Sequence, residues 1–267
     1  MLIDTHCHLA DEKFHADRDA VIARARDAGV TTFVEIAESP DHWDAAIRLA
    51  EQHPFIYASL GIHPHHANEI GPMQWPELAK RLRNLLQHPK VVALGEFGLD
   101  YYRMQSSKDQ QRYLFLQQLA LANELNKPIV IHCRDAHADV QEAIQEFYPE
   151  TSLSIECPRP VGVIHCFSGA WPDAQTYLMH RFYLGLDAPV TYPSSKVLQD
   201  VVQRVPLQRI VLETDSPYLP PQTHRGQRNE PSYLPAVAEA ISELKHKAVN
   251  DIAQATTQNA NNLFRIH

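Results

Sequence analysis

Eight short apolar runs recur along the chain of 267 residues, and a segment long enough for a helix separates each run from the next. Several of the intervening segments, including 18–29, 110–126 and 194–205, have apolar residues at helical spacing. Strands that are apolar on both faces and alternate with helices are typical of a parallel sheet covered by helices. The predicted strands begin at Leu2, Val30, Phe55, Val91, Pro128, Val161, Phe182 and Arg209.

Eight such units in about 250 residues have the size of a (β/α)8 barrel, also called a TIM barrel. We therefore predict an α/β chain with a single TIM-barrel domain over residues 1–267. An open, doubly wound sheet is the structural alternative, but it usually has a glycine-rich turn after its first strand, and none follows Leu2–Leu9. We expect an extended connection at Tyr148–Pro160 and a long loop over 215–235, because both are rich in turn-forming residues.

The chain is acidic, with 24 Lys and Arg residues against 32 Asp and Glu residues and a net charge of −8. This balance argues against a broad basic surface that wraps nucleic acid, but it leaves room for a small phosphate site. No stretch is apolar for long enough to span a bilayer, and the first residues lack a signal-peptide pattern. The four cysteines lack the paired spacing of a zinc or redox motif. These features predict a cytoplasmic protein.

The first predicted strand, LIDTHCHL, contains two histidines two positions apart. Because side chains alternate along a strand, His6 and His8 share a face with Asp4, whereas Cys7 points to the other face. The same alternation predicts that Cys133 and Cys166, each of which follows a histidine, pack under helices and bind no metal. One pair of histidines alone fits either a metal site or a polar strand end.

Four further residues of metal-binding type lie at the predicted carboxyl ends of other strands. In a barrel these ends converge on one mouth, where active sites are built. Clustered carboxylates and imidazoles would be costly there unless a cation compensated them. With the opening pair, the candidate ligands are His6, His8, Glu96, His132, His165 and Asp215.

Six ligands exceed the three that a catalytic ion commonly takes from a protein. We therefore predict two divalent ions, which could be Zn, Mn, Mg or Fe. Glu96 can bridge one site, built by His6, His8 and Asp215, and a second site, built by His132 and His165. Paired ions clamp the attacking and leaving oxygens of an in-line displacement, which predicts a hydrolase. In this hypothesis Asp215 also acts as the general base, although a role as ligand alone stays open.

Seven segments, in order and at their spacing, resemble the TatD family of metal-dependent deoxyribonucleases in the amidohydrolase superfamily. They are DTHCHL, GIHPH, LGEFGLDYYR, NKPIVIHCRDA, IHCFSG, LETDSPYL and HRGQRNEP. The resemblance implies a TIM barrel, divalent metals on the same six residues, and hydrolysis of phosphodiester bonds in DNA as a 3′ to 5′ exonuclease. Single strands or 3′ ends of DNA are then the expected substrate, with no membrane and no obligate protein partner. Asp187 departs from the family pattern, and an unpaired carboxylate near the mouth would repel a phosphate.

Other residues near the predicted mouth are candidate substrate contacts. His63 closes the third strand and is predicted to contact the substrate or the leaving group, since the ligand count is already full. Arg134 is predicted to bind phosphate, because a guanidinium is the usual bidentate partner of that group. Tyr101 and Tyr102 can stack on bases, although loop aromatics are often packing residues. Surface ion pairing is the alternative for several of the arginines, among them Arg103, Arg225 and Arg228.

Two other functions remain open on sequence grounds. The same site could hydrolyse small phosphate esters, amides or lactones, because a fold does not fix the substrate. A metal-binding scaffold without activity is the non-enzymatic alternative, and it would have a closed coordination shell with no place for water.

Overall fold

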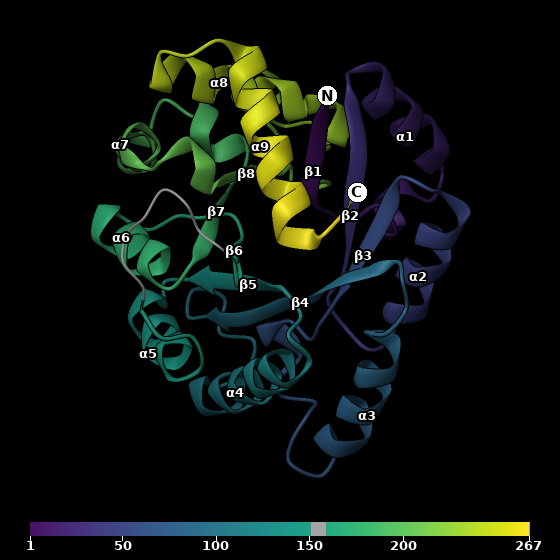
Figure 1. The fold of residues 1–267 in the computed structure, drawn as a ribbon. Coiled ribbons are helices and arrows are strands. Elements are labelled where there is room, and N and C mark those ends of the chain that lie inside the picture. Colours follow the sequence, from purple (N-terminus) through teal and green to yellow (C-terminus); the bar gives the residue numbers. More distant parts are fainter. Residues whose placement is uncertain (151–158, 267) are drawn as a thin grey trace.

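The computed structural model describes residues 1–150 and 159–266. In these residues, eight parallel strands form one sheet in the order β1 to β8, with helices around its outside (Figure 1). This arrangement confirms the predicted TIM barrel, and each strand lies where an apolar run predicted it. The strands are β1 Leu2–Cys7, β2 Val30–Ala37, β3 Ile56–Leu60, β4 Val91–Asp100, β5 Ile129–Arg134, β6 Gly162–Ile164, β7 Phe182–Leu186 and β8 Ile210–Leu212.

The helices cover the outer face of the sheet, and none of those described is long and apolar enough to cross a bilayer. The three predicted helical segments correspond to α1, α4 and α7. Helix α4 begins at a capping box in which Ser107 and Gln110 satisfy each other's backbone N–H groups. The helices are α1 Arg18–Asp27, α2 Trp43–Gln52, α3 Trp75–Leu85, α4 Lys108–Leu125, α5 His137–Phe147, α6 Trp171–Met179, α7 Lys196–Arg204, α8 Leu234–Lys245 and α9 Val249–Phe264.

The barrel closes between its last and first strands, just beyond the end of β8. The backbone N–H of Asp215 donates to the carbonyl of His6 at 2.9 Å, and the N–H of His8 donates to the carbonyl of Ser216 at 2.8 Å. The hydroxyl of Thr5 adds a bond to the carbonyl of Leu212 at 2.9 Å. This closure, which we call the seam, places the chain after β8 beside the two opening histidines.

Two apolar layers hold the barrel together. The outer layer lies between the strands and the surrounding helices. The inner layer fills the barrel, where Ile3, Val34 and Val130 pack with the carboxyl-terminal residues Leu263 and Phe264. Helix α9 therefore lies across the amino-terminal end of the barrel, in front in Figure 1, and closes it. Each large side chain buried there contributes about 1.5–3 kcal/mol.

The predicted packing of the cysteines under helices is confirmed for two residues. Cys7 and Cys133 are buried in the outer layer, as the alternation of side chains along β1 and β5 requires. Cys166 lies beyond the end of β6 in a left-handed backbone conformation with φ of 44°, where alternation no longer applies, and it is only half-buried. Most of the predicted connection Tyr148–Pro160 lies outside the described residues.

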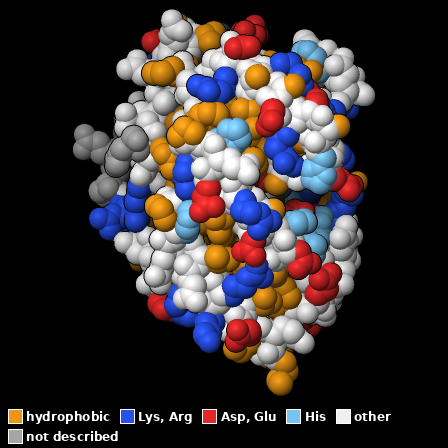
Figure 2. All heavy atoms as spheres, turned by 90° about the vertical axis from the view of Figure 1, so that its right-hand side faces the viewer, with side chains coloured by type: hydrophobic (Ala, Val, Ile, Leu, Met, Phe, Trp, Pro, Cys, Tyr) orange, Lys and Arg blue, Asp and Glu red, His pale blue; other side chains and the backbone are white. Residues whose placement is uncertain are grey.

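The face of the molecule that carries α1, α2 and α3 shows acidic and basic side chains intermingled (Figure 2). No wide basic surface is visible on this face, in agreement with the net charge of −8. Nucleic acid bound here would have to be held by local groups.

Candidate metal centre

The carboxyl ends of the strands bring the six predicted ligands together. His6 lies in β1 and His132 in β5, while His8 and His165 directly follow β1 and β6. Glu96 does not end β4 as predicted. The strand continues to Asp100, and Glu96 occupies an irregular point in its ladder with β5. The ladder is tight here, because a Cβ at Gly98 would collide with the carbonyl of His132.

Glu96 lies at the centre of the cluster and is buried. Its Oε2 is 3.4 Å from Nε2 of His6. Its Oε1 is 2.6 Å from Nδ1 of His132, 3.5 Å from Nε2 of His63 and 3.6 Å from Nε2 of His165. The two carboxylate oxygens therefore face different imidazoles, which is the arrangement a bridging ligand needs.

Asp215 adds the second carboxylate from the other side of the seam. Its Oδ1 is 3.4 Å from Nε2 of His8, 3.7 Å from Nε2 of His6 and 3.9 Å from Nε2 of His165. The backbone of Asp215 is left-handed, with φ of 55°. Aspartate tolerates this conformation better than most residues, and such positions cluster at functional sites.

Three overlapping groups of side chains have ligand atoms close enough to share an ion. They are His6, His165 and Asp215; His6, His8 and Glu96; and His63, Glu96 and His132. His63, which the sequence assigned to the substrate, therefore lies among the candidate ligands. His165 falls beside Asp215 in these groups, so its predicted pairing with His132 stays a prediction.

The chemistry of His6 fits a bound cation. Its side chain is fully buried, and neither ring nitrogen has a hydrogen-bond partner within residues 1–150 and 159–266. Its ring stacks on that of His165, with centroids 3.4 Å apart. Nε2 faces the carboxylates of Glu96 and Asp215 without a well-aligned hydrogen bond to either, and a divalent ion at Nε2 would satisfy all three groups.

The electrostatics of the cluster point the same way. Burial lowers the pKa of His8, but its hydrogen bond to Asp215 and the charge of Glu38 outweigh burial and raise that pKa to about 10. Burial raises the pKa of Glu96, yet the surrounding imidazoles, His165 and His63 first, hold it well below the usual range. The carboxylates of the cluster thus stay ionised and attract positive charge. Protonated imidazoles supply this charge when no metal ion is bound.

Comparison with known proteins identifies the family. The sequence profile of the family described as TatD related DNase matches residues 3–265. The chain belongs to the TatD family. It is accordingly a metal-dependent hydrolase.

Curated relatives and solved structures agree with this assignment. The uncharacterized metal-dependent hydrolase YabD of Bacillus subtilis is 41% identical over the full length of both chains. The 3′-5′ ssDNA/RNA exonuclease TatD of Pantoea vagans is 36% identical and covers 99% of this chain and 100% of its own. The crystal structure of YjjV, a TatD homologue from Escherichia coli K12, superposes with a TM-score of 0.90 at 31% identity, over 100% of this chain and 98% of that chain.

Two buried carboxylates that the sequence analysis did not single out hold candidate ligands in place. Glu213 accepts a hydrogen bond from Nδ1 of His165 at 2.9 Å and another from the backbone N–H of Cys166. Asp100 lies 3.0 Å from Nε2 of His65 and 3.4 Å from Nε2 of His132. Such partners fix the orientation of a ligating imidazole. The signal was an acidic residue beside each quoted ligand motif, in LETD and in GEFGLD.

The arginines around the mouth divide into two kinds. Arg134 lies over the ring of Tyr102, with the guanidinium carbon 4.6 Å from the centroid, and Tyr102 is 61% exposed. The guanidinium groups of Arg103 and Arg134 have no carboxylate partner among the described residues. Arg228 instead pairs with Asp17 and Glu230, so the surface ion-pair interpretation holds for it.

Asp187 lies after β7 but beneath the surface of the mouth. It is 1% exposed, and neither carboxylate oxygen has a hydrogen-bond partner among the described residues. Burial, reinforced by the charges of Glu213 and Asp215, raises its pKa to about 8, although the thiol of Cys166 and the charge of His165 act in the opposite direction. A neutral, buried carboxyl group repels phosphate far less than the exposed carboxylate that the sequence suggested.

Proposed function

We propose that this TatD-family hydrolase uses two divalent ions to remove nucleotides from the 3′ end of single-stranded DNA. The observation that carries the proposal is the position of Glu96, whose two oxygens face separate imidazoles in a buried cluster at the barrel mouth. Paired ions on such a bridge suit in-line displacement at phosphorus. Imidazole and carboxylate ligands accept Zn, Mn, Mg or Fe.

Support for a nucleic-acid substrate comes from the relatives and from the mouth. The TatD protein of Pantoea vagans is named a 3′-5′ ssDNA/RNA exonuclease. In this chain, Arg103 follows β4 and Arg134 ends β5, the strand that carries His132, and neither guanidinium group has a carboxylate partner among the described residues. They are suited to the backbone phosphates, and Tyr102 is suited to stacking on a base.

Each residue then has a defined task. Bound divalent ions supply Lewis acidity, which lowers the pKa of water and neutralises charge on the phosphate. Asp215 accepts the proton of the attacking water, because its carboxylate is held ionised beside His8 and His6. Glu96 holds the two groups of imidazoles at a fixed separation. His63 either joins the ligands around Oε1 of Glu96 or contacts the leaving oxygen, as the sequence predicted.

The test is cleavage of a 5′-labelled single-stranded oligonucleotide by the purified protein, with Zn, Mn, Mg or Fe added in turn. We expect a ladder that shortens one nucleotide at a time from the 3′ end. Small phosphate esters, an amide and a lactone are assayed beside it. Hydrolysis of these compounds, with no cleavage of DNA under any ion, would refute the nuclease and support the alternative substrate class.

A further inference from the structure

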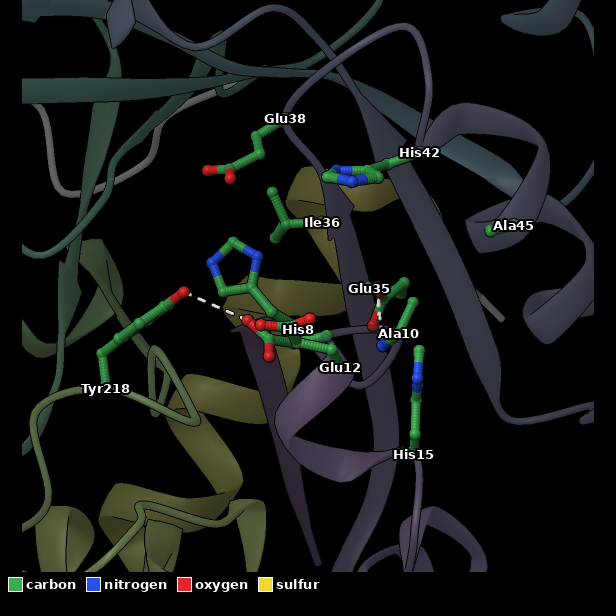
Figure 3. A pocket seen from close by; sticks show the side chains of 11 residues that line it. His8, Ala10, Glu12, His15, Glu35, Ile36, Glu38, His42, Ala45 and Tyr218 are labelled. Carbon is green, nitrogen blue, oxygen red and sulfur yellow. Dashed lines mark hydrogen bonds between the residues drawn. The ribbon is translucent and has the colours of Figure 1, made fainter. Parts of the chain in front are cut away.

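A cavity of about 470 Å³ opens beside His8, on the flank of the metal centre formed by β1 and β2 (Figure 3). Tyr218 forms part of its wall, with its ring edge-on to that of His8 at 5.8 Å between centroids. Ala10, Ile36 and Ala45 supply apolar lining. Cavities of a few hundred Å³ hold one small organic molecule, so this one has room for a nucleoside.

The charge of the cavity is opposite to that of the other flank. Four carboxylates and three imidazoles line it, from Asp11, Glu12, Glu35 and Glu38 and from His8, His15 and His42. No lysine or arginine lines it among the described residues, although the ammonium group of Lys13 lies 4.1 Å from the ring centroid of Tyr218. Asp11 is already engaged, because it accepts a hydrogen bond from the hydroxyl of Tyr218 at 3.1 Å. The carboxylates of Glu12 and Glu38 have no hydrogen-bond or ion-pair partner within the described chain. A phosphate entering this cavity would meet the carboxylates of Glu12 and Glu38, of which Glu38 is partly offset by its attraction to His8.

The opposite flank, beyond His132, carries the unpaired guanidinium groups of Arg103 and Arg134. A nucleic acid strand that crosses the centre therefore meets positive charge on one side and negative charge on the other. The polyanionic part of the strand belongs on the arginine side. Only an uncharged group fits the acidic side, and the one uncharged unit at the end of a strand is its terminal nucleoside.

We propose that the cavity beside His8 is the subsite for the 3′-terminal nucleoside, and that Glu12 and Glu38 exclude substrates carrying a phosphate beyond it. The proposal rests on the nuclease function proposed above. It explains why each cleavage would remove a single nucleotide from the 3′ end. Water forms a new bond to the last phosphorus, whose bond to the 3′ oxygen of the preceding nucleotide breaks. Asp215 takes the proton of the water and returns it to the departing 3′ oxygen. The strand then leaves with a free 3′ hydroxyl on the arginine side, and the nucleoside 5′-monophosphate leaves from the cavity.

The experiment compares two oligonucleotides of one sequence, ending in a 3′ hydroxyl or in a 3′ phosphate. They are tested with the wild-type protein and with the double variant Glu12→Gln/Glu38→Gln. Glu239→Gln is the matched control, because Glu239 is exposed on α8, away from the cavity. We expect the wild type to cleave the 3′-hydroxyl strand at least about tenfold faster, since two like charges oppose the extra phosphate. The double variant should reduce this ratio to below about threefold, and the control should keep it.

A binding measurement gives the second readout. Isothermal titration compares 2′-deoxyadenosine 5′-monophosphate with the 3′,5′-bisphosphate. We expect the wild type to bind the bisphosphate more weakly than the monophosphate, even though the greater negative charge of the bisphosphate would favour binding to divalent cations. The double variant should bind the bisphosphate more tightly than the wild type does. Equal rates and affinities in the wild type, or ratios that the double variant leaves unchanged, overturn the proposal. Absence of cleavage of both strands refutes the nuclease function instead, and the titration then decides on the cavity alone.

Discussion

Replacing Asp187 with asparagine should stabilise the protein at neutral pH and above. The carboxyl group of Asp187 is buried without a hydrogen-bond partner in the described structure, and its pKa rises from 3.8 to about 8 on folding. A carboxyl group whose pKa is higher in the folded state holds its proton more tightly there. Its contribution to stability is therefore full below about pH 4 and is lost as the pH rises towards 8. Asparagine has the same shape and no charge to bury.

The pKa shift sets the size of the effect. The shifted pKa of Asp187 contributes to the free energy of unfolding. As the pH rises from the unfolded pKa of 3.8 to 7, this contribution falls by about 1.4 kcal/mol for each pH unit, or by at most about 4 kcal/mol in all. Relaxation of the protein around the charged carboxylate reduces the cost of burying it. We therefore expect Asp187→Asn to raise the free energy of unfolding at pH 7 by about 2 kcal/mol. For a chain of this length, that gain corresponds to a rise in Tm of roughly 4–8 °C.

Thermal unfolding from pH 5 to pH 8 tests the reasoning, with metal-free and metal-saturated protein. The rise in Tm should be small at pH 5, largest at pH 8 and reduced by bound cations, which stabilise the carboxylate. Asp41→Asn, at an exposed position between β2 and α2, is the control and should shift Tm by little at any pH. A loss of stability in Asp187→Asn that grows with pH would show that the carboxylate has a favourable partner, and the argument would fail.

Four further outcomes follow from the site. Glu96→Ala should lose both ions, measured as metal per chain after dialysis, because Glu96 alone among the described carboxylates lies at ion-pair distance from both His6 and His132; an unchanged count excludes a bridge. Asp215→Asn, assayed at full metal occupancy, should lower turnover at least about 10²-fold through loss of the general base; near-normal turnover would leave Asp215 a ligand at most. Metal binding at pH 7 should release protons and become tighter as the pH rises, because the hydrogen bond of His8 to Asp215 keeps that imidazole protonated until a metal displaces the proton. The number of protons released is measured by calorimetry in buffers of different ionisation enthalpy. A heat of binding that is the same in all buffers would contradict the prediction. Cys7→Ala should keep its metal content, since its thiol lies in the outer apolar layer, and loss of an ion from the folded variant would contradict that placement.

The sequence predicted the barrel and the identity of the clustered residues because both depend on short-range patterns. Alternation along β1 places His6 and His8 on one face, and the size and number of the units require closure of the sheet. The position of Asp215 followed from that closure, and the hydrogen bond from its backbone N–H to His6 confirms it.

The remainder of the site depends on distances that no pattern encodes. Nothing in GIHPH distinguishes an imidazole 3.5 Å from Glu96 from one that faces only the substrate, so the place of His63 among the candidate ligands needed the structure. Burial of Asp187 could not be predicted either, because it depends on how the chain turns after β7. The cavity beside His8 is lined from the segment after β1, from β2 and α2, and from the loop after β8, which are far apart in the sequence.

The seam has a consequence for the timing of activity during synthesis. The centre requires Asp215, some two hundred residues after His6, to bond to the first strand, and α9 must then seal the opposite end of the barrel. Almost the whole of this chain must therefore emerge from the ribosome before β1 can pair with the segment after β8. Long-range pairing of this kind forms late in folding. A nascent chain therefore has no assembled hydrolytic centre.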